Sequence, residues 1–304
     1  MGERALVGTP YLADRALRTE YDRDIAPRTR AALAKILTEI DPPGERSARP
    51  RRIVDLGAGT GAAGEALRAH YGPEVNVIAV DRTAATTGVR VADVTDRRAL
   101  ATLGQADLVV AAHVLNELHV GDAADRRLER LTELVRHWCR VLLEPDGTLV
   151  LVEPALRETS RVLLAVRDRL VADGLHVVAP CFFAGPCPAL LRERDWCHDT
   201  VPARAGNRRV DFSYLVLRNP REAVGEPALH RVVSDPLPEK GKLRLFVCGA
   251  EGRMPVIRLD RHGSTANAAF DRAARGDVLH LSRTAFARDG ARILPESEVT
   301  LKRR

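Results

Sequence analysis

The stretch "RRIVDLGAGTG" at residues 51–61 places three glycines directly after a short apolar run. The apolar run predicts a buried strand, and the glycines let the chain turn sharply from that strand into a helix. A glycine has no Cβ, so a ligand can lie against the backbone of such a turn. The stretch therefore predicts a strand–loop–helix unit of an α/β domain that binds a ligand at its loop.

Segments typical of strands and of helices alternate after this loop. Further strands are expected at 74–83, at 89–96, from 106 and at 148–155, and helices at 124–142 and 158–174. This alternation is typical of a doubly wound parallel sheet with helices on both faces. Two later β-rich runs, 209–220 and 242–249, are expected to close the sheet as an antiparallel pair, which gives a seven-stranded Rossmann-like fold.

Three parts are expected along the 304 residues. Apolar residues at helical spacing between 12 and 40 predict an N-terminal helical segment at 1–48, and a proline-rich stretch at 41–52 predicts a linker. The α/β domain is expected at 49–249, with a Cys-rich loop at 179–200 inserted in it. A small C-terminal extension at 250–304 completes the chain.

Composition favours an ordinary globular protein, because 45% of the residues are hydrophobic and 29% are charged. Neither a secretory signal pattern nor an apolar run long enough to span a bilayer is found in the sequence, so we expect a cytoplasmic location and no membrane partner. The formal net charge of +6 comes mostly from arginine and suits an RNA partner. A solvated basic surface explains the same charge equally well.

Acidic residues accompany the glycine loop at the ends of three strands. Asp55 precedes the glycines, Asp81 ends the second strand, and Asp93 ends the third. Within the same stretch, residues 59–64 also match the dinucleotide pattern G-x-G-x-x-G, so a nicotinamide cofactor stays an alternative. The acids at 55 and 93 favour a different nucleoside cofactor.

These motifs together resemble the cofactor site of class I S-adenosylmethionine-dependent methyltransferases. The resemblance rests on "VDLGAGTG", on Asp81, and on "ADV" at residues 92–94. It implies that the loop holds the methionine and ribose part, Asp81 binds ribose hydroxyls, Asp93 lies by the adenine amino group, and Asp55 meets the methionine ammonium. The implied cofactor-binding residues are Asp55, Gly57, Gly59, Thr60, Gly61, Asp81 and Asp93.

The segment "AAHVLNELH" at 111–119 follows the fourth strand, where base and RNA amino methylases carry an Asn-Pro-Pro-Tyr type motif. Methyl transfer from a sulfonium can rely largely on positioning, so a general base is optional. His113, Asn116 and Glu117 are the candidates for contact with a methyl acceptor, with His113 or Glu117 as a base. Helix capping or contact with the cofactor explains Asn116 and Glu117 as well.

Five cysteines, an odd number, favour a metal or catalytic role over a disulfide framework. Cys181, Cys187 and Cys197 share one proline-bearing loop, and Cys248 ends a late strand. Four thiolates suit zinc or an iron–sulfur cluster, and their spacing leaves both open. Cys139 lies on the apolar side of a helix and is expected in the core.

The cysteine segments resemble those of methyltransferase-like assembly factors of the small ribosomal subunit, known from mitochondria and with bacterial relatives. The resemblance rests on "APCFFAGPCPALLRERDWCHDT" and "DPLPEKGKLRLFVCGAEG", and it departs from the family at residues 182–183, two phenylalanines in place of Pro-His. It implies a 4Fe-4S cluster held by Cys181, Cys187, Cys197 and Cys248. It also implies small-subunit ribosomal RNA or a pre-ribosomal particle as the partner.

The sequence thus predicts an S-adenosylmethionine-binding, iron–sulfur methyltransferase-like protein that acts on small-subunit ribosomal RNA or in subunit assembly. A non-catalytic RNA-binding assembly factor and a small-molecule methyltransferase with structural zinc are the alternatives. A monomer is favoured. The residues expected to contact phosphate are Arg192, Arg194, Arg204, Arg208, Arg209, Lys240 and Lys242.

Overall fold

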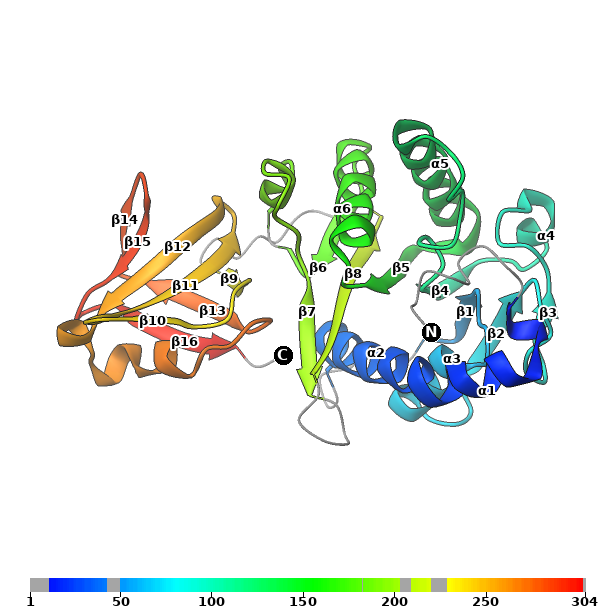
Figure 1. The fold of residues 1–304 in the computed structure, drawn as a ribbon, viewed down its shortest axis with the longest axis horizontal. Helices are drawn as coiled ribbons and strands as arrows, with labels where there is room; N and C mark the ends of the chain where they lie inside the picture. Colours follow the sequence, from blue (N-terminus) through cyan, green and yellow to red (C-terminus); the bar gives the residue numbers. More distant parts are fainter. Residues whose placement is uncertain (1–10, 43–49, 182, 203–208, 220–228, 303–304) are drawn as a thin grey trace.

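The computed structural model describes residues 11–42, 50–181, 183–202, 209–219 and 229–302. Two β-sheets follow one another along the long axis of the molecule, and helices flank the first of them (Figure 1). The proline-rich stretch expected as a linker lies mostly outside the described residues. None of the helices in these ranges combines the length and the apolar composition needed to cross a bilayer.

The first sheet contains the glycine loop and has the strand order β3-β2-β1-β4-β5-β8-β6, with β7 paired to β8. Strands β1 to β5 pair in parallel, and β8 runs antiparallel to β5, β6 and β7. Its strands are β1 (Arg52–Leu56), β2 (Asn76–Asp81), β3 (Arg90–Val91), β4 (Ala106–Ala112), β5 (Leu143–Pro154), β6 (His176–Ala179), β7 (Asp199–Pro202) and β8 (Arg209–Arg218). The chain order reverses between β1 and β4, and open α/β sheets bind ligands outside the carboxyl ends of strands at such a point.

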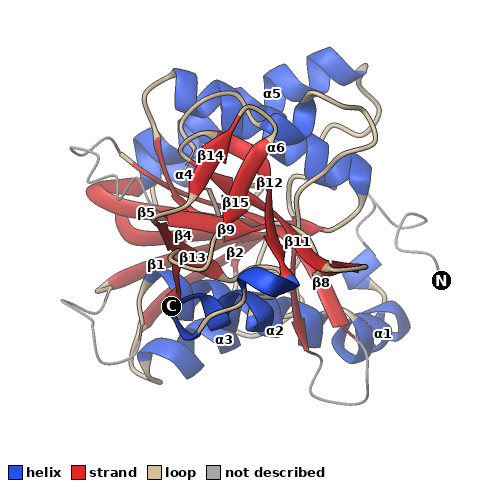
Figure 2. Cartoon of the chain, turned by 90° about the vertical axis from the view of Figure 1, so that its left-hand side faces the viewer, coloured by secondary structure: helices blue, strands red, loops and turns tan. Residues whose placement is uncertain are grey.

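Helices cover both faces of this sheet, as a layer above and a layer below it (Figure 2). One core cluster joins α2 and α3 to one face, and another joins α5 and α6 to the other. The helical elements of this part are η1 (Tyr11–Ala13), α1 (Arg15–Asp24), α2 (Ala26–Ile40), α3 (Ala62–Tyr71), α4 (Arg97–Ala101), α5 (Ala124–Leu142), α6 (Arg157–Ala172) and η2 (Pro188–Leu190). This arrangement confirms the doubly wound α/β architecture, with a mixed rather than purely parallel sheet.

The second sheet has the order β14-β15-β12-β11-β9-β13-β16, with β10 paired to β11. Its core gathers side chains from β9, β11, β12, β13, β15, β16 and the 3-10 helix η4. The elements are β9 (Leu229–Val232), β10 (Leu237–Glu239), β11 (Lys242–Gly249), β12 (Gly252–Leu259), η3 (Asp260–His262), η4 (Thr265–Arg272), β13 (Val278–Ser282), β14 (Ala285–Ala287), β15 (Gly290–Ile293) and β16 (Glu298–Lys302). The described part of the chain from β9 onward thus has a hydrophobic core of its own.

The prediction that 242–249 forms the seventh strand of the first sheet is wrong. This segment is β11, and it pairs with β9, β10 and β12 of the second sheet. A two-residue connection between Gly249 and Gly252 turns β11 directly into β12, so the expected boundary at 249/250 falls inside a hairpin. The first sheet is completed instead by β6, a strand of only four residues that pairs with β8.

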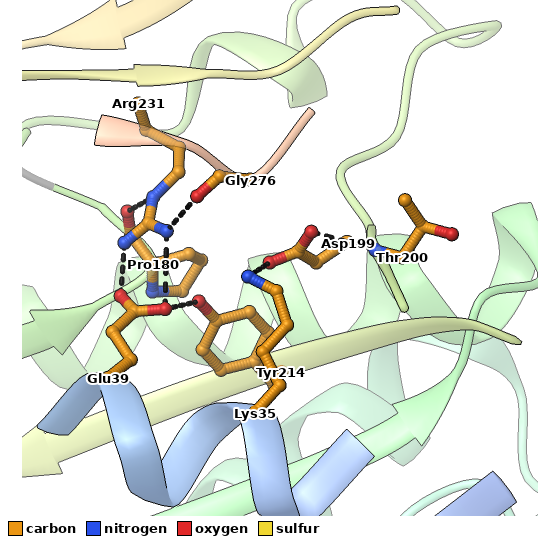
Figure 3. A network of polar contacts seen from close by, with 8 residues as sticks. All are labelled: Lys35, Glu39, Pro180, Asp199, Thr200, Tyr214, Arg231 and Gly276. Atoms are coloured by element: carbon orange, nitrogen blue, oxygen red, sulfur yellow. Dashed lines mark hydrogen bonds and ion pairs between the residues drawn. The ribbon is translucent and has the colours of Figure 1, made fainter. Parts of the chain in front are cut away.

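A buried polar network joins the two sheets (Figure 3). Arg231 of β9 donates to Glu39 of α2, with 3.2 Å between Nη1 and Oε2, and also to the carbonyl oxygens of Pro180 at 3.0 Å and Gly276 at 2.6 Å. The Tyr214 hydroxyl donates to Glu39 at 2.8 Å. Although burial opposes ionisation, the Arg231 charge holds the pKa of Glu39 below its ordinary value. The network therefore fixes the second sheet against α2 and β8.

Candidate functional site

A pocket lies at the carboxyl ends of β1, β2 and β4, where the sheet order reverses. It encloses about 690 Å³, open solvent included. Six residues predicted from the sequence line it: Gly57, Gly59, Asp81, Asp93, His113 and Glu117. The structure therefore brings together the predicted cofactor loop, two of the predicted acids and the predicted acceptor segment.

The glycine loop has a backbone that other residues adopt only with strain. Gly57 and Gly59 have φ angles of +69° and +53°. A Cβ on Gly57 would also lie 2.5 Å from Cγ2 of Val114, which lines the same pocket. Glycine at 57 therefore permits both the turn and the close approach of the two pocket walls.

Asp81 joins the first and second loops through its carboxylate. Its Oδ2 accepts from the backbone N–H of Gly59 at 2.9 Å, and its Oδ1 accepts from that of Thr83 at 2.8 Å. A carboxylate offers about four acceptor positions, so two stay available for hydroxyl donors of a ligand. This side chain is 8% exposed and lines the pocket, which suits the predicted contact with a ribose.

Asp93 lies at another part of the pocket wall, after β3. Its Oδ1 accepts from the backbone N–H and from the hydroxyl of Thr95, both at 2.7 Å. These two bonds fix the orientation of the carboxyl group beside Val94, an apolar residue of the same wall. An acid next to an apolar surface suits the predicted adenine contact.

Three predicted cofactor residues, Asp55, Thr60 and Gly61, are not among the residues that line the pocket. Asp55 is 1% exposed, and both of its carboxyl oxygens lack a hydrogen-bond partner among the described residues. Burial, and then the negative charge of Asp81, raise the pKa of Asp55 to about 7. The Thr60 hydroxyl is also buried without a partner in the described structure, and Gly61 is the N-cap residue of α3, with a φ of +94°.

The acceptor segment after β4 forms the opposite wall. His113 has a φ of +59°, and its backbone N–H donates to the carbonyl oxygen of Val152 at 2.7 Å. Burial, and then the charge of Arg28, lower the pKa of the His113 imidazole to about 4. The ring is therefore neutral near pH 7. Glu117 lies 3.6 Å from the Arg82 guanidinium across the pocket rim, so its carboxylate is partly neutralised.

Asn116 has a structural position rather than one facing the pocket. With its amide NH₂ turned inward, it donates to Glu153 Oε2 at 3.0 Å and to the His113 carbonyl oxygen at 2.8 Å. Glu153, at the end of β5, also accepts from the backbone N–H groups of Leu115 at 2.8 Å and Asn116 at 3.1 Å. These bonds hold the acceptor segment in place, so Asn116 connects backbone segments instead of presenting its amide to a ligand.

Sequence reasoning missed Glu153, Leu12 and Tyr21. A charged residue inside the apolar run "TLVLVEPA" was a signal for Glu153, because a buried carboxylate in a strand needs partners. Leu12 and Tyr21 line the pocket from η1 and α1. Arg18 fixes this segment by donating to the carbonyl oxygens of Leu12 at 3.1 Å and Ala85 at 3.3 Å. The N-terminal helices thus form part of the pocket wall.

Cys181 and Cys197 line a cavity between the two sheets, and Cys187 packs in one cluster with Cys197. Burial, and then the charges of Cys181, Cys187 and Cys248, raise the pKa of the Cys197 thiol well above its ordinary value. Burial and Cys181 likewise raise the pKa of Cys187 to about 11. The charges of these thiols therefore influence one another, and the predicted ligand set stays a prediction. Within the described ranges, however, no group of three or more His, Cys, Asp or Glu side chains has the geometry of a metal site.

Two arginines of α6 hold the Cys-rich loop by its backbone. Arg161 donates to the carbonyl oxygens of Ala189 at 3.0 Å, Arg192 at 2.8 Å and Asp195 at 2.7 Å. Arg167, 1% exposed, donates to the carbonyl oxygens of Phe183 and Gly185. Helix α6 thus fixes the backbone of the Cys-rich loop.

The remaining cysteine, Cys139, is 7% exposed in the core of the first sheet, as predicted.

The residues expected to contact phosphate have different positions. Arg192, Arg194 and Lys240 are exposed, whereas the Arg209 and Lys242 side chains have ion-pair partners in Asp235 and Glu239. Arg204 and Arg208 lie outside the described residues. No single basic patch follows from these positions alone.

Comparison with known families decides the affiliation. Residues 18–280 match the model of the family described as mitochondrial small ribosomal subunit Rsm22. The chain belongs to the Rsm22 family. The match spans both sheets, so it includes the α/β domain and most of the second sheet of this Rsm22 relative. The family resemblance predicted from the cysteine segments is therefore confirmed.

Solved structures give partial likenesses to this Rsm22 family member. The plantazolicin methyltransferase BpumL in complex with SAH is 12% identical with a TM-score of 0.46, and the match covers 69% of this chain and 93% of that one. The N-methyltransferase NodS from Bradyrhizobium japonicum WM9, in complex with S-adenosyl-L-homocysteine, is 16% identical with a TM-score of 0.44, with coverage of 69% and 95%. No curated protein sequence gives a significant match.

Proposed function

We propose that this Rsm22 family member binds S-adenosylmethionine and acts on the ribosomal RNA of the small subunit, as a methyltransferase-like factor. The observation that carries the proposal is the pocket in which the glycine loop, Asp81 and Asp93 meet the acceptor segment at the sheet's switch point. Asp81 is held there by Gly59 and Thr83 with acceptor capacity left over. A nucleoside with a ribose diol fits that capacity.

The choice of S-adenosylmethionine over a dinucleotide rests on the acids and on the loop. Asp93 beside Val94 suits an adenine, and Asp81 suits its ribose. A pyrophosphate needs backbone N–H groups free to point at it. The N–H groups of Gly57 and Ala58 instead donate to the Val80 carbonyl oxygen at 2.8 and 3.0 Å, and that of Gly59 donates to Asp81 at 2.9 Å. These three loop N–H groups are therefore not available to a pyrophosphate.

Methyl transfer in this pocket would depend on positioning. The neutral His113 ring can accept a proton from a methyl acceptor, and Glu117 beside Arg82 can orient the acceptor. A second candidate function, binding of cofactor and RNA without turnover, is favoured by one observation: the Asn116 amide is used to hold the acceptor segment to Glu153. An amide in that position is not available to hold a substrate amino group.

The iron–sulfur part of the prediction is retained as a proposal. Cys181, Cys187, Cys197 and Cys248 would hold a 4Fe-4S cluster, with four-coordinate zinc as the alternative. Charge interactions among the thiols support this donor set, because Cys181 contributes to the raised pKa of Cys187, Cys197 and Cys248. When bound, the group would tie the Cys-rich loop to β11. A cytoplasmic location and a monomeric state stay predictions.

Transfer of labelled methyl from S-adenosylmethionine to deproteinised small-subunit RNA tests the enzymatic proposal. Methyl incorporation that requires the protein supports the methyltransferase. Calorimetric binding of S-adenosylmethionine, together with salt-sensitive RNA binding and no incorporation, would instead support the non-catalytic factor. Transfer to a small molecule with no affinity for RNA would contradict both.

A further inference from the structure

The hairpin of β11 and β12 has two chemically different faces. In an antiparallel pair, residues opposite each other point to the same side of the sheet. Leu245, Val247 and Val256 point into the core of the second sheet. The opposite side of the hairpin, which we call the outer face, presents Lys242, Arg244, Phe246, Cys248, Arg253, Pro255, Ile257 and Leu259, none of them fully buried.

Phe246 lies at the centre of the outer face between two guanidinium groups. The Arg253 Cζ is 4.7 Å from the centroid of the Phe246 ring, and the Arg244 Cζ is 5.8 Å from it. On the neighbouring strand, Pro255 lies directly opposite Phe246 and adds a second flat apolar side chain to this face. Proteins that bind single-stranded nucleic acid stack bases on such aromatic rings while cations contact the phosphates. Because both guanidinium groups lie over the ring, a base would stack on Phe246 in place of one of them.

Carboxylates lie on the outer face too, and they limit its charge. Glu239 pairs with Lys242 at 2.9 Å and with Arg244 at 2.6 Å, and Asp195 pairs with Arg253 at 3.1 Å. The five side chains are between 21% and 36% exposed, so water screens these ion pairs and each contributes little to stability. Three cationic side chains thus face two carboxylates on this surface. Phosphate groups can replace the carboxylates as partners of the cations with little loss of protein stability.

The outer face continues into the Cys-rich loop. The pair between Arg253 and Asp195 connects the two, and the loop residue Pro188 lies near Gly252 at the tip of the hairpin. Beside Asp195, Trp196 is 39% exposed, and Leu191 on the same loop is 83% exposed. Arg192 and Arg194 on this loop are exposed as well. The loop therefore adds exposed apolar and cationic side chains to those of the outer face.

We infer that the outer face binds single-stranded RNA, with a base stacked on Phe246 and phosphates held by Lys242, Arg244 and Arg253. The inference rests on the proposed function, because it names the surface by which this protein would reach its RNA. An acidic peptide could pair with the cations, but it would not use the ring between them. Duplex RNA buries its base faces, so it could not stack on Phe246 either.

The test measures binding of a fluorescent single-stranded RNA of about ten nucleotides, a length within the range that one such surface covers. Phe246→Ala should weaken binding by about 5- to 150-fold, the usual effect of losing one stacked base. Phe286→Ala is the matched control, because Phe286 is 52% exposed on β14, away from the outer face. Phe246→Leu retains an apolar side chain but no ring, so it separates the loss of stacking from any loss of stability in Phe246→Ala. It should bind RNA as weakly as Phe246→Ala.

Arg244→Ala and Arg253→Ala should each reduce the slope of log affinity against log salt by about 0.7, as expected for one phosphate contact to a single strand. Wild-type protein that binds S-adenosylmethionine but no RNA would contradict the proposed partner. Wild-type binding that Phe246→Leu leaves unchanged would overturn only the assignment of the outer face. Equal competition by polyglutamate, or tighter binding of duplex RNA, would overturn it as well.

Discussion

Arg231 and Glu39 are 192 residues apart in the chain and form a buried ion pair, with 3.2 Å between Nη1 and Oε2. Their side chains are only 4% and 5% exposed. Because Glu39 belongs to α2 and Arg231 to β9, the pair spans the boundary between the two sheets (Figure 3). Arg231 also donates to the carbonyl oxygen of Pro180, the neighbour of Cys181, so the pair supports the Cys-rich loop.

Glu39→Gln should lower the free energy of unfolding by about 3–5 kcal/mol, because it leaves the Arg231 charge buried without a counter-charge. Tyr214→Phe removes only one hydrogen bond to Glu39 and should cost about 1 kcal/mol. Glu65→Gln is the surface control, since its pair with Arg30 is 60% and 39% exposed and should contribute at most about 1 kcal/mol. Urea unfolding at pH 7 measures all three.

The same pair gives a pH dependence. The pKa of Glu39 is lower in the folded protein than its ordinary value, so the pair contributes stability above that ordinary value. This contribution is lost as the pH falls toward the folded-state pKa. Wild-type protein should therefore lose more stability between pH 6 and pH 3 than Glu39→Gln does. Parallel curves for the two proteins would show that Glu39 does not titrate in this way.

Glu153 should give the opposite dependence. Burial raises its pKa from 4.5 to about 8, against the bonds from Leu115 and Asn116. A carboxyl group with a raised folded-state pKa contributes stability below its unfolded pKa, and this contribution is lost as the pH rises through about 8. Glu153→Gln should thus gain stability relative to wild type between pH 5 and pH 9. Unfolding curves across that range test this, and a constant difference would contradict it.

Asp81→Asn should weaken binding of S-adenosylmethionine by about 10- to 100-fold, the cost of losing charged hydrogen bonds to a ligand hydroxyl. Asp96→Asn is the control, because Asp96 caps α4 by accepting from the N–H of Arg98 at 2.9 Å and does not line the pocket. Calorimetry measures affinity, and thermal melting of the free proteins separates binding from loop stability. Equal affinities for Asp81→Asn and wild type would exclude the predicted ribose contact.

The sequence predicted the part of the pocket that depends on local rules. Asp81 ends β2 and Asp93 follows β3, and the carboxyl ends of parallel strands meet at one edge of a sheet, so the strand prediction alone places both acids at that edge. Leu12 and Tyr21 could not be predicted, because their place depends on how α1 packs against loops far away in the chain. Strand β11 was assigned to the wrong sheet for a similar reason. Its alternating pattern predicts a strand with one buried face, but says nothing of which core that face meets.

Cys248→Ser should remove the bound metal, whereas Cys139→Ser should leave it. Cys248 is the one predicted ligand on β11, and its thiol is close enough to Cys181 and Cys187 for their charges, after burial, to raise its pKa. Cys139 is buried in the other core, among side chains of α5 and the first sheet. Protein purified without oxygen should be brown and contain about four irons per chain if the cluster assignment is right. Colourless protein with one zinc would refute the cluster, and equal metal content in both variants would refute the ligand set.

Because Cys248 alone joins β11 to the Cys-rich loop in this ligand set, its replacement should also lower the melting temperature of the metal-loaded protein but leave that of chelator-treated protein unchanged.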